Sequence, residues 1–478
     1  MKQRLFLFHF FLFALNSLLF CYCYYFDFIL DIDLSIFISS VSVLTILYHF
    51  LFFEKSLFSI INLFNGFCIL FLYGNVINYI VYNVDDFGIY NLMEGANIPF
   101  RDFTSSIFLI NLGISLINMT YLKFESFKNS RIIIHNKIPK DIILFYIIFS
   151  ILASVKFFLE LKHINKIGYV NFYMNGLGSL NYYSPLIKNA HTLLLLFYGI
   201  ILSYYPRKKI FLIISMSFCF IMMLNSLKGA RVLFLLPFLF SFWFYSKFYQ
   251  KITFSGNVLK IITICFVLLI GSKTLKSSRL NYDNSIFNIS DLPSLVLKET
   301  GSTQKLVAVF LSKRDNIDSN YPFILEPILY PLFYINNFDI YKAGHSKELV
   351  ETRNSLNHKI SYLLNPSYYL NGNAVGSSMI AESFQYGLPF FIIIMVLFGR
   401  FLCFVQNIKI NSKFIYLLPL LFNAAVFAAR DSPFPNTWIL VKLTFLYALF
   451  YLIRKILKYS SKKPSFDKNF NHDNIYNL

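Results

Sequence analysis

About a dozen runs of roughly twenty apolar, aromatic-rich residues follow one another along this chain, each ended by a short polar break. Residues 5–26, 57–82 and 438–457 are examples. An α-helix rises 1.5 Å per residue, so about 20 apolar residues cross a bilayer core of about 30 Å. No soluble domain could bury that many continuous apolar runs, and the composition agrees, since hydrophobic residues make up 56% of the 478 residues and charged residues only 14%. We therefore predict an all-α polytopic membrane protein.

The apolar runs define twelve expected transmembrane helices and one long break. The spans are expected at about residues 5–26, 34–53, 57–83, 103–122, 141–160, 186–205, 209–227, 232–249, 257–273, 387–406, 414–430 and 437–457. The chain would then consist of an N-terminal bundle of about nine spans (1–273), a large loop with interfacial helices (274–386), C-terminal spans (387–457) and a tail (458–478). Long loops of this kind are usually functional.

Basic residues concentrate in alternate connections, which predicts the orientation. The clusters lie at 123–140, at 206–209 and in the tail after 454. Because short cytoplasmic loops carry most lysine and arginine, both termini should be cytoplasmic and residues 274–386 periplasmic. The formal net charge of +19 is explained in the same way, so we expect the bilayer and not nucleic acid as a partner.

All six cysteines lie inside apolar runs, where cysteine behaves as a small hydrophobic residue. Their spacing matches neither a metal site nor a disulfide framework. The chain also has no Walker-type glycine loop and no dinucleotide fingerprint. We therefore expect no metal and no cofactor.

Within the long loop, residues 321–338 are apolar but are interrupted by three prolines and by Glu326. Proline at that spacing breaks a straight helix. We expect a pair of helices here that lies at the interface or re-enters the membrane. The alternative is one further full span, which would reverse the orientation of everything after it.

Three arginines at the ends of apolar runs are candidate ligands for phosphate. They are Arg231, Arg279 and Arg430, and the expected topology places all three outside the cytoplasm. Guanidinium groups bind phosphate oxygens in a bidentate way. The alternative for each is a snorkelling or salt-bridged residue at a helix end, and Arg430 could pair with Asp431.

Two carboxylates are candidate general bases. Glu382 lies in a short helical stretch between Gly376 and Gly387, where the long loop returns to the membrane, and Glu299 opens the sequence Glu-Thr-Gly-Ser. A carboxylate beside a sugar hydroxyl could take its proton. Four histidines are expected on the same side of the membrane, more as packing residues than as bases: His163, His191, His345 and His358.

The order of these motifs resembles the bacterial O-antigen polymerases of the Wzy type. The resemblance covers most of the chain by architecture and residues 225–237, 295–311 and 370–435 by motif. The motifs are a Lys-Gly-Ala-Arg stretch from 228, Glu-Thr-Gly-Ser from 299, a Gly-Ser…Ala-Glu…Gly pattern over 376–387, and Ala-Arg-Asp-Ser from 429. The pattern over 376–387 is one residue shorter than the family pattern that it resembles.

This resemblance implies a GT-C-like, metal-independent glycosyltransferase of the bacterial inner membrane, with an architecture shared with O-antigen ligases. Such enzymes join oligosaccharide repeat units carried on undecaprenyl diphosphate at the periplasmic face, and a chain-length regulator protein is a further expected partner. Carried onto this chain, Arg231 and Arg430 would neutralise the departing diphosphate and Arg279 would assist. Glu382, with Glu299 as its rival base, would activate the acceptor hydroxyl or orient the site.

Two other functions fit parts of the pattern. An O-antigen ligase uses a similar lipid-linked donor, and His345 or His358 could supply the loop histidine expected there. A flippase or other polysaccharide transporter would more often show internal repeats and short loops on both sides. We find no repeat, and the large loop lies on one side.

Overall fold

The computed structural model describes residues 2–49, 56–82, 98–125, 137–167, 184–228, 232–250, 252, 292–336, 345–409, 414–433 and 437–460. Its longer α-helices are α1 (Lys2–Tyr25), α2 (Ile32–Tyr48), α5 (Phe100–Phe124), α6 (Lys140–Ile167), α8 (Pro185–Ser203), α9 (Lys208–Ser226), α10 (Val232–Phe248), α20 (Leu388–Asn407) and α22 (Thr437–Ser460). The shorter ones are α3 (Ile60–Phe71), α4 (Gly74–Tyr82), α12 (Leu292–Thr300), α13 (Ser302–Lys313), α14 (Glu326–Asn336), α16 (Lys347–Thr352), α17 (Leu356–Leu364), α18 (Pro366–Leu370), α19 (Met379–Ser383) and α21 (Leu418–Phe427). These described residues contain no β-strand, so the all-α prediction is confirmed for them.

Six of the described helices are long and apolar enough to cross a membrane: α1, α5, α6, α8, α9 and α20. A seventh span is formed if α3 and α4 are taken together. Helices also coincide with the predicted runs at α2, α10, α21 and α22, whereas the run at 257–273 lies outside the described residues. The multi-pass character is therefore confirmed, and the count of twelve stays a prediction.

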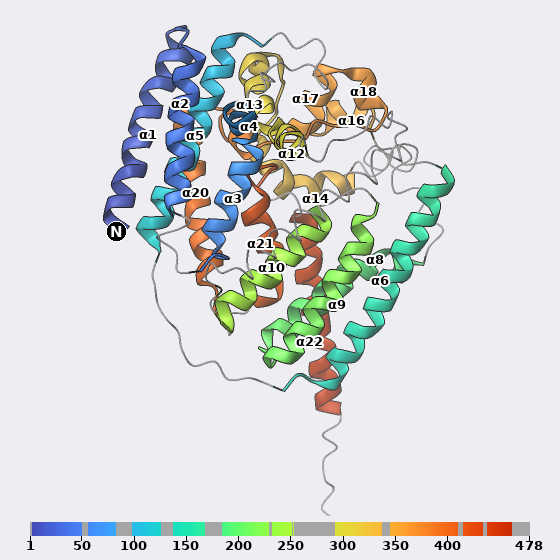
Figure 1. Ribbon diagram of the computed structural model, residues 1–478. Helices are drawn as coiled ribbons and strands as arrows, with labels where there is room; N and C mark the ends of the chain where they lie inside the picture. The colour runs from blue at the N-terminus through green and yellow to red at the C-terminus, as the bar shows by residue number, and fades with distance from the viewer. Residues whose placement is uncertain are drawn as a thin grey trace, which may run out of the picture.

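Helix α5 is at the centre of one half of the bundle. In its most apolar stretch 83% of the residues are buried, compared with 28% in α1 and in α6. It packs against α1, α2, α20 and α13, while α6, α8, α9 and α22 form the other half (Figure 1). The outer faces of α1 and α6 expose Leu18, Ile151 and Phe158, which suits a surface covered by lipid.

The predicted span at 57–83 is bent, and the reason is a contact far away in sequence. Its two helices, α3 and α4, meet at an angle of 61°. A Cβ atom on Gly74, where α4 begins, would lie 2.7 Å from the carbonyl oxygen of Leu297. A Cβ on Gly301 would likewise lie 2.5 Å from the backbone nitrogen of Asn75. Two glycines thus let α4 cross the end of α12 at very short distance, which turns α4 away from the line of α3.

The short helices α12, α13, α16, α17 and α18 gather over one end of the long helices (Figure 1). The helix pair predicted over 321–338 is wrong for the described part, residues 321–336. A 3-10 turn (Phe323–Leu325) leads there into the single helix α14. Within the described residues, α14 has 11 residues and is about 16 Å long, shorter than a full span needs, and the alternative of a full span stays open because residues 337 and 338 lie outside the described residues.

Candidate functional site

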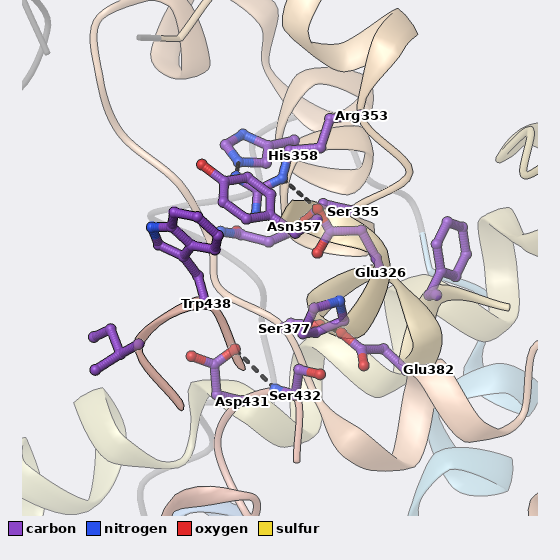
Figure 2. A pocket seen from close by; sticks show the side chains of 14 residues that line it. Glu326, Arg353, Ser355, Asn357, His358, Ser377, Glu382, Asp431, Ser432 and Trp438 are labelled. Carbon is purple, nitrogen blue, oxygen red and sulfur yellow. Dashed lines mark hydrogen bonds and ion pairs between the residues drawn. The ribbon is translucent and has the colours of Figure 1, made fainter. Parts of the chain in front are cut away.

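A cavity of about 370 Å³ lies where α14, α17, α19 and the beginning of α22 meet. Figure 2 shows that its wall combines charged side chains from four separate segments: Glu326, Arg353, Glu382 and Asp431. Trp438 and Tyr330 add aromatic surface. Such a mixture of convergent polar groups and aromatic rings is typical of a ligand site.

Hydrogen bonds between loops hold the wall segments together. The backbone N–H of Gly376 donates to Oδ1 of Asn357 at 2.9 Å, which joins the approach to α19 to α17. The backbone N–H of Phe323 donates to Oε1 of Gln385 at 2.6 Å, which joins the turn before α14 to the end of α19. Gly376 has φ +92°, a left-handed conformation that favours glycine. These contacts hold together the part of the cavity wall that comes from residues 323–382, and Asp431, Ser432, Trp438 and Ile439 complete the wall.

Arg353, between α16 and α17, is held on three sides. Its Nε lies 2.5 Å from Oε1 of Glu326 in an ion pair, and its Nη1 lies 3.0 Å from Nε2 of His358. The guanidinium carbon lies 4.6 Å from the ring centroid of Tyr330. Glu326 is itself buried, so this pairing satisfies a carboxylate that would otherwise be costly to bury. The result is an oriented guanidinium at the cavity wall.

His358 serves to position Arg353. A guanidinium has only donors, so Nε2 of His358 must accept from it, and the ring proton must then lie on Nδ1. Nδ1 lies 2.8 Å from the hydroxyl of Tyr369, whose ring stacks on His345 with centroids 4.5 Å apart. Burial, then the charge of Arg353, hold the pKa of His358 well below its usual value. His358 is therefore neutral, and its only lone pair in the ring plane is already used.

Glu382 lies deep in the wall on α19 and is 4% exposed. The hydroxyl of Ser377 donates to its Oε1 at 2.5 Å, while Oε2 makes no hydrogen bond of ordinary geometry to any described residue. Burial raises the pKa of Glu382 to about 8; the nearby Asp431 and Glu326 act in the same direction, and the hydroxyls of Ser377 and Ser432 oppose them. A carboxyl with this pKa exchanges its proton near neutral pH.

Asp431 contributes a third carboxyl group to the cavity. Its Oδ1 accepts a hydrogen bond from the backbone N–H of Ser432 at 2.8 Å. Burial raises its pKa, and the charges of Arg430 and Arg353 oppose that shift. Within the part of the chain that the structure describes, no three His, Cys, Asp or Glu side chains are grouped as metal ligands.

The predicted site residues differ in where they lie relative to the cavity, and some of them are outside the described part of the chain. Glu382 lines the cavity, whereas Arg430 does not: its guanidinium lies over the ring of Phe71, 5.2 Å from the centroid. Arg231 and Arg279 lie outside the described residues, as does the side chain of Glu299.

Part of the motif that follows Glu299 has a packing role. Gly301 makes the close contact with α4 described above. Its carbonyl oxygen also accepts a hydrogen bond from Nδ2 of Asn75 at 2.9 Å. The hydroxyl of Thr300 donates to the carbonyl of Val296, one turn earlier, at 2.7 Å. Packing therefore accounts for the glycine of Glu-Thr-Gly-Ser, and a catalytic role for Glu299 stays a prediction.

Sequence reasoning missed Arg353 and did not assign Asp431 to the site. A signal existed in Glu326, a single acid inside an apolar stretch, because a buried carboxylate needs a cationic partner. Nothing in the sequence showed that the partner is Arg353, 27 residues further on.

The comparison with family models finds one match that covers nearly the whole chain. Residues 5–460 match the model described as O-antigen polysaccharide polymerase Wzy. No curated protein matches the chain, and no solved structure matches it. The family match agrees with the multi-pass helical architecture and spans every segment that lines the cavity. The chain therefore belongs to the O-antigen polysaccharide polymerase Wzy family.

Proposed function

We propose that this protein polymerises oligosaccharide repeat units carried on undecaprenyl diphosphate, at the periplasmic face of the bacterial inner membrane. The family match supports polymerisation of O-antigen units. The choice of site rests on one observation: the ion-paired Arg353 and the buried Glu382 line the same cavity. These two residues offer the two aids that transfer from a lipid diphosphate needs, a cation and a proton acceptor.

In the proposed reaction, an acceptor hydroxyl oxygen attacks the anomeric carbon of the donor's reducing-end sugar. The bond between that carbon and the diphosphate oxygen breaks, and its electron pair leaves with the diphosphate. The hydroxyl proton passes to Glu382. Arg353 offsets the negative charge that develops on the departing oxygen, and such stabilisation is worth about 3 kcal/mol or more in a dry site. Trp438 offers an aromatic face to a sugar ring.

The three arginines of the sequence prediction keep their proposed role beside Arg353. Arg430 directly precedes Asp431 of the cavity wall, so its charge acts on the site even though its guanidinium lies over Phe71. We propose that Arg231 and Arg279 bind the diphosphate as well. Glu299 remains the rival base to Glu382. The transfer is proposed to need no metal.

An O-antigen ligase is the main alternative, and the geometry of the histidines argues against it. His358 does line the cavity. However, its Nε2 accepts from Arg353, so it has no lone pair with which to take a proton from an acceptor. His345 lies behind it, with Nδ1 3.0 Å from the carbonyl oxygen of Tyr369. A carboxylate base, and hence the polymerase, is favoured.

Deleting the gene tests the function directly. The lipopolysaccharide ladder on a gel should collapse to core plus a single repeat unit, because units are still made and ligated but not joined. Plasmid-borne protein should restore the ladder. Bare core without any unit would contradict polymerisation and would point to a ligase or a flippase.

The proposed topology places both termini in the cytoplasm and residues 274–386 in the periplasm, with domain boundaries as predicted above. In a variant without its native cysteines, Asn316→Cys should react with a membrane-impermeant maleimide added to intact cells, because Asn316 is exposed. Ser460→Cys, at the end of α22, should react only after lysis. The opposite pattern would overturn the orientation.

A further inference from the structure

A second group of charges lies outside the cavity, on helices α6 and α22 and just after the end of α9. Lys156 and Glu160 come from α6, Lys228 follows α9, and Lys442 comes from α22. Nζ of Lys228 lies 2.5 Å from Oε2 of Glu160, and Nζ of Lys156 lies 3.9 Å from Oε1. We call these four residues the lysine cluster.

Helix α8 connects the members of the lysine cluster. Nζ of Lys156 donates to the carbonyl oxygen of Lys188 at 2.9 Å, and Nζ of Lys442 donates to Oδ1 of the adjacent Asn189. Lys228 and Lys442 are both near enough to Lys156 for their charges to repel it. The three ammonium groups therefore share one small volume.

The lysine cluster carries an excess of positive charge in a place where charge is costly. Among the residues that the structure describes, three lysines of the cluster meet the one carboxylate of Glu160, a formal net charge of +2 (three minus one). The side chains of Lys156 and Lys228 are only 15% and 14% exposed, and Glu160 only 4%. Partly buried like charges repel each other strongly because little water screens them. An anion bound between them would remove that cost.

The position of the lysine cluster, close to the cavity, indicates which anion it binds. On α22, Lys442 follows Trp438 by four residues and Ile439 by three, and both of these line the cavity. Residues at these spacings share one helix face, so the cluster lies about one turn, or about 5 Å, along α22 from the cavity wall.

Lipid-facing surface reaches the lysine cluster on α6. Ile151 is 60% exposed, Val155 43% and Phe158 68%, and these residues surround Lys156 in sequence. Positions 151, 155 and 158 lie on one face of the helix, where an isoprenoid tail in the bilayer can pack. A phosphate headgroup attached to that tail would reach the ammonium groups.

We propose that Lys156, Lys228 and Lys442 bind the diphosphate of the acceptor lipid while the donor's diphosphate occupies the cavity. This rests on the polymerase function proposed above, because that reaction needs two lipid diphosphates at once and only one of them departs. The donor's group meets the fixed fork of Arg353. The acceptor's group takes no part in bond breaking, and flexible lysines suit a ligand that must be held and then released.

Counting bound lipids by native mass spectrometry tests the proposal, with undecaprenyl diphosphate added to the purified protein. Wild type should bind two copies. Lys156→Gln/Lys442→Gln should bind one, with the second weakened by about tenfold or more for each lost charge-assisted contact. Lys162→Gln, an exposed lysine on the same helix, is the matched control and should still bind two. A second copy retained by the double variant overturns the proposal.

Glu160→Gln separates a binding role from a structural one. It removes the competing carboxylate, so the second copy should bind more tightly. Weaker binding would mean that the lysine cluster only holds helices together, and equal displacement by phosphatidylglycerol would mean a general anionic-lipid contact; both overturn the proposal. A protein that binds no undecaprenyl diphosphate contradicts the polymerase function itself, whereas one that polymerises with a single copy bound contradicts only this inference.

Discussion

Lysine in place of Arg353 should lower the rate of polymerisation by about a hundredfold, although the positive charge is kept. The guanidinium meets Glu326 and His358 through different nitrogens while its face lies over Tyr330. An ammonium is a single point of charge and cannot keep this orientation. Ladder length in complemented cells and the rate with purified protein both measure the effect.

Arg400→Lys is the matched control for Arg353→Lys. Arg400 is an exposed arginine on α20 that lies over the ring of Phe124, away from the cavity. Its replacement should leave the ladder unchanged. Arg353→Ala is a poorer test, because it leaves the buried Glu326 without its partner and should cost about 3–5 kcal/mol of stability. Wild-type ladders from well-expressed Arg353→Lys protein would remove Arg353 from the mechanism.

Glutamine in place of Glu382 should lower the rate by about a hundredfold to ten-thousandfold and should also change its pH dependence. The amide can still accept from Ser377 but cannot take a proton. With the pKa of Glu382 raised to about 8, the fraction of charged base in wild type grows as the pH rises through 8. The wild-type rate should rise over that range and then level, and the rate of Glu382→Gln should not.

Stability provides an independent measurement of the same pKa. The folded pKa of Glu382 lies above its ordinary value of 4.5, so the stabilisation that burial of the neutral form provides is complete below about pH 4.5 and is lost as the pH rises through about 8. Glutamine stays neutral, so Glu382→Gln should gain thermal stability over wild type between pH 5 and pH 9.

A rate loss in Glu299→Gln but not in Glu382→Gln would move the role of general base to Glu299.

Local pattern sufficed to predict the helices, because a run of apolar residues needs no distant partner to form a membrane helix. Bends and pairings depended on contacts across the chain. The turn between α3 and α4 comes from Gly74 meeting α12, and the hydropathy of residues 57–83 does not reveal it. The single helix α14, where two were predicted, shows in addition that Pro331 fits inside an α-helix here.

The residues of the candidate site could likewise be predicted from the sequence only in part. Glu382 could be predicted because glycines and a short helix surround it in sequence. Arg353 could not, because its partners Glu326 and His358 are brought to it by the fold. Arg430 was chosen for its place at the end of a span, and that local reasoning could not foresee that its side chain lies over Phe71.

The most direct test of the account is polymerisation by the purified protein alone. The protein would be placed in liposomes with a lipid-linked repeat unit and a chelator, and the saccharide and lipid products would be followed together. The account predicts a ladder of lengthening chains, one undecaprenyl diphosphate released for each linkage formed, and a rate about a hundredfold lower with Arg353→Lys. Free oligosaccharide without a ladder, or a ladder made equally fast by Arg353→Lys, would contradict it.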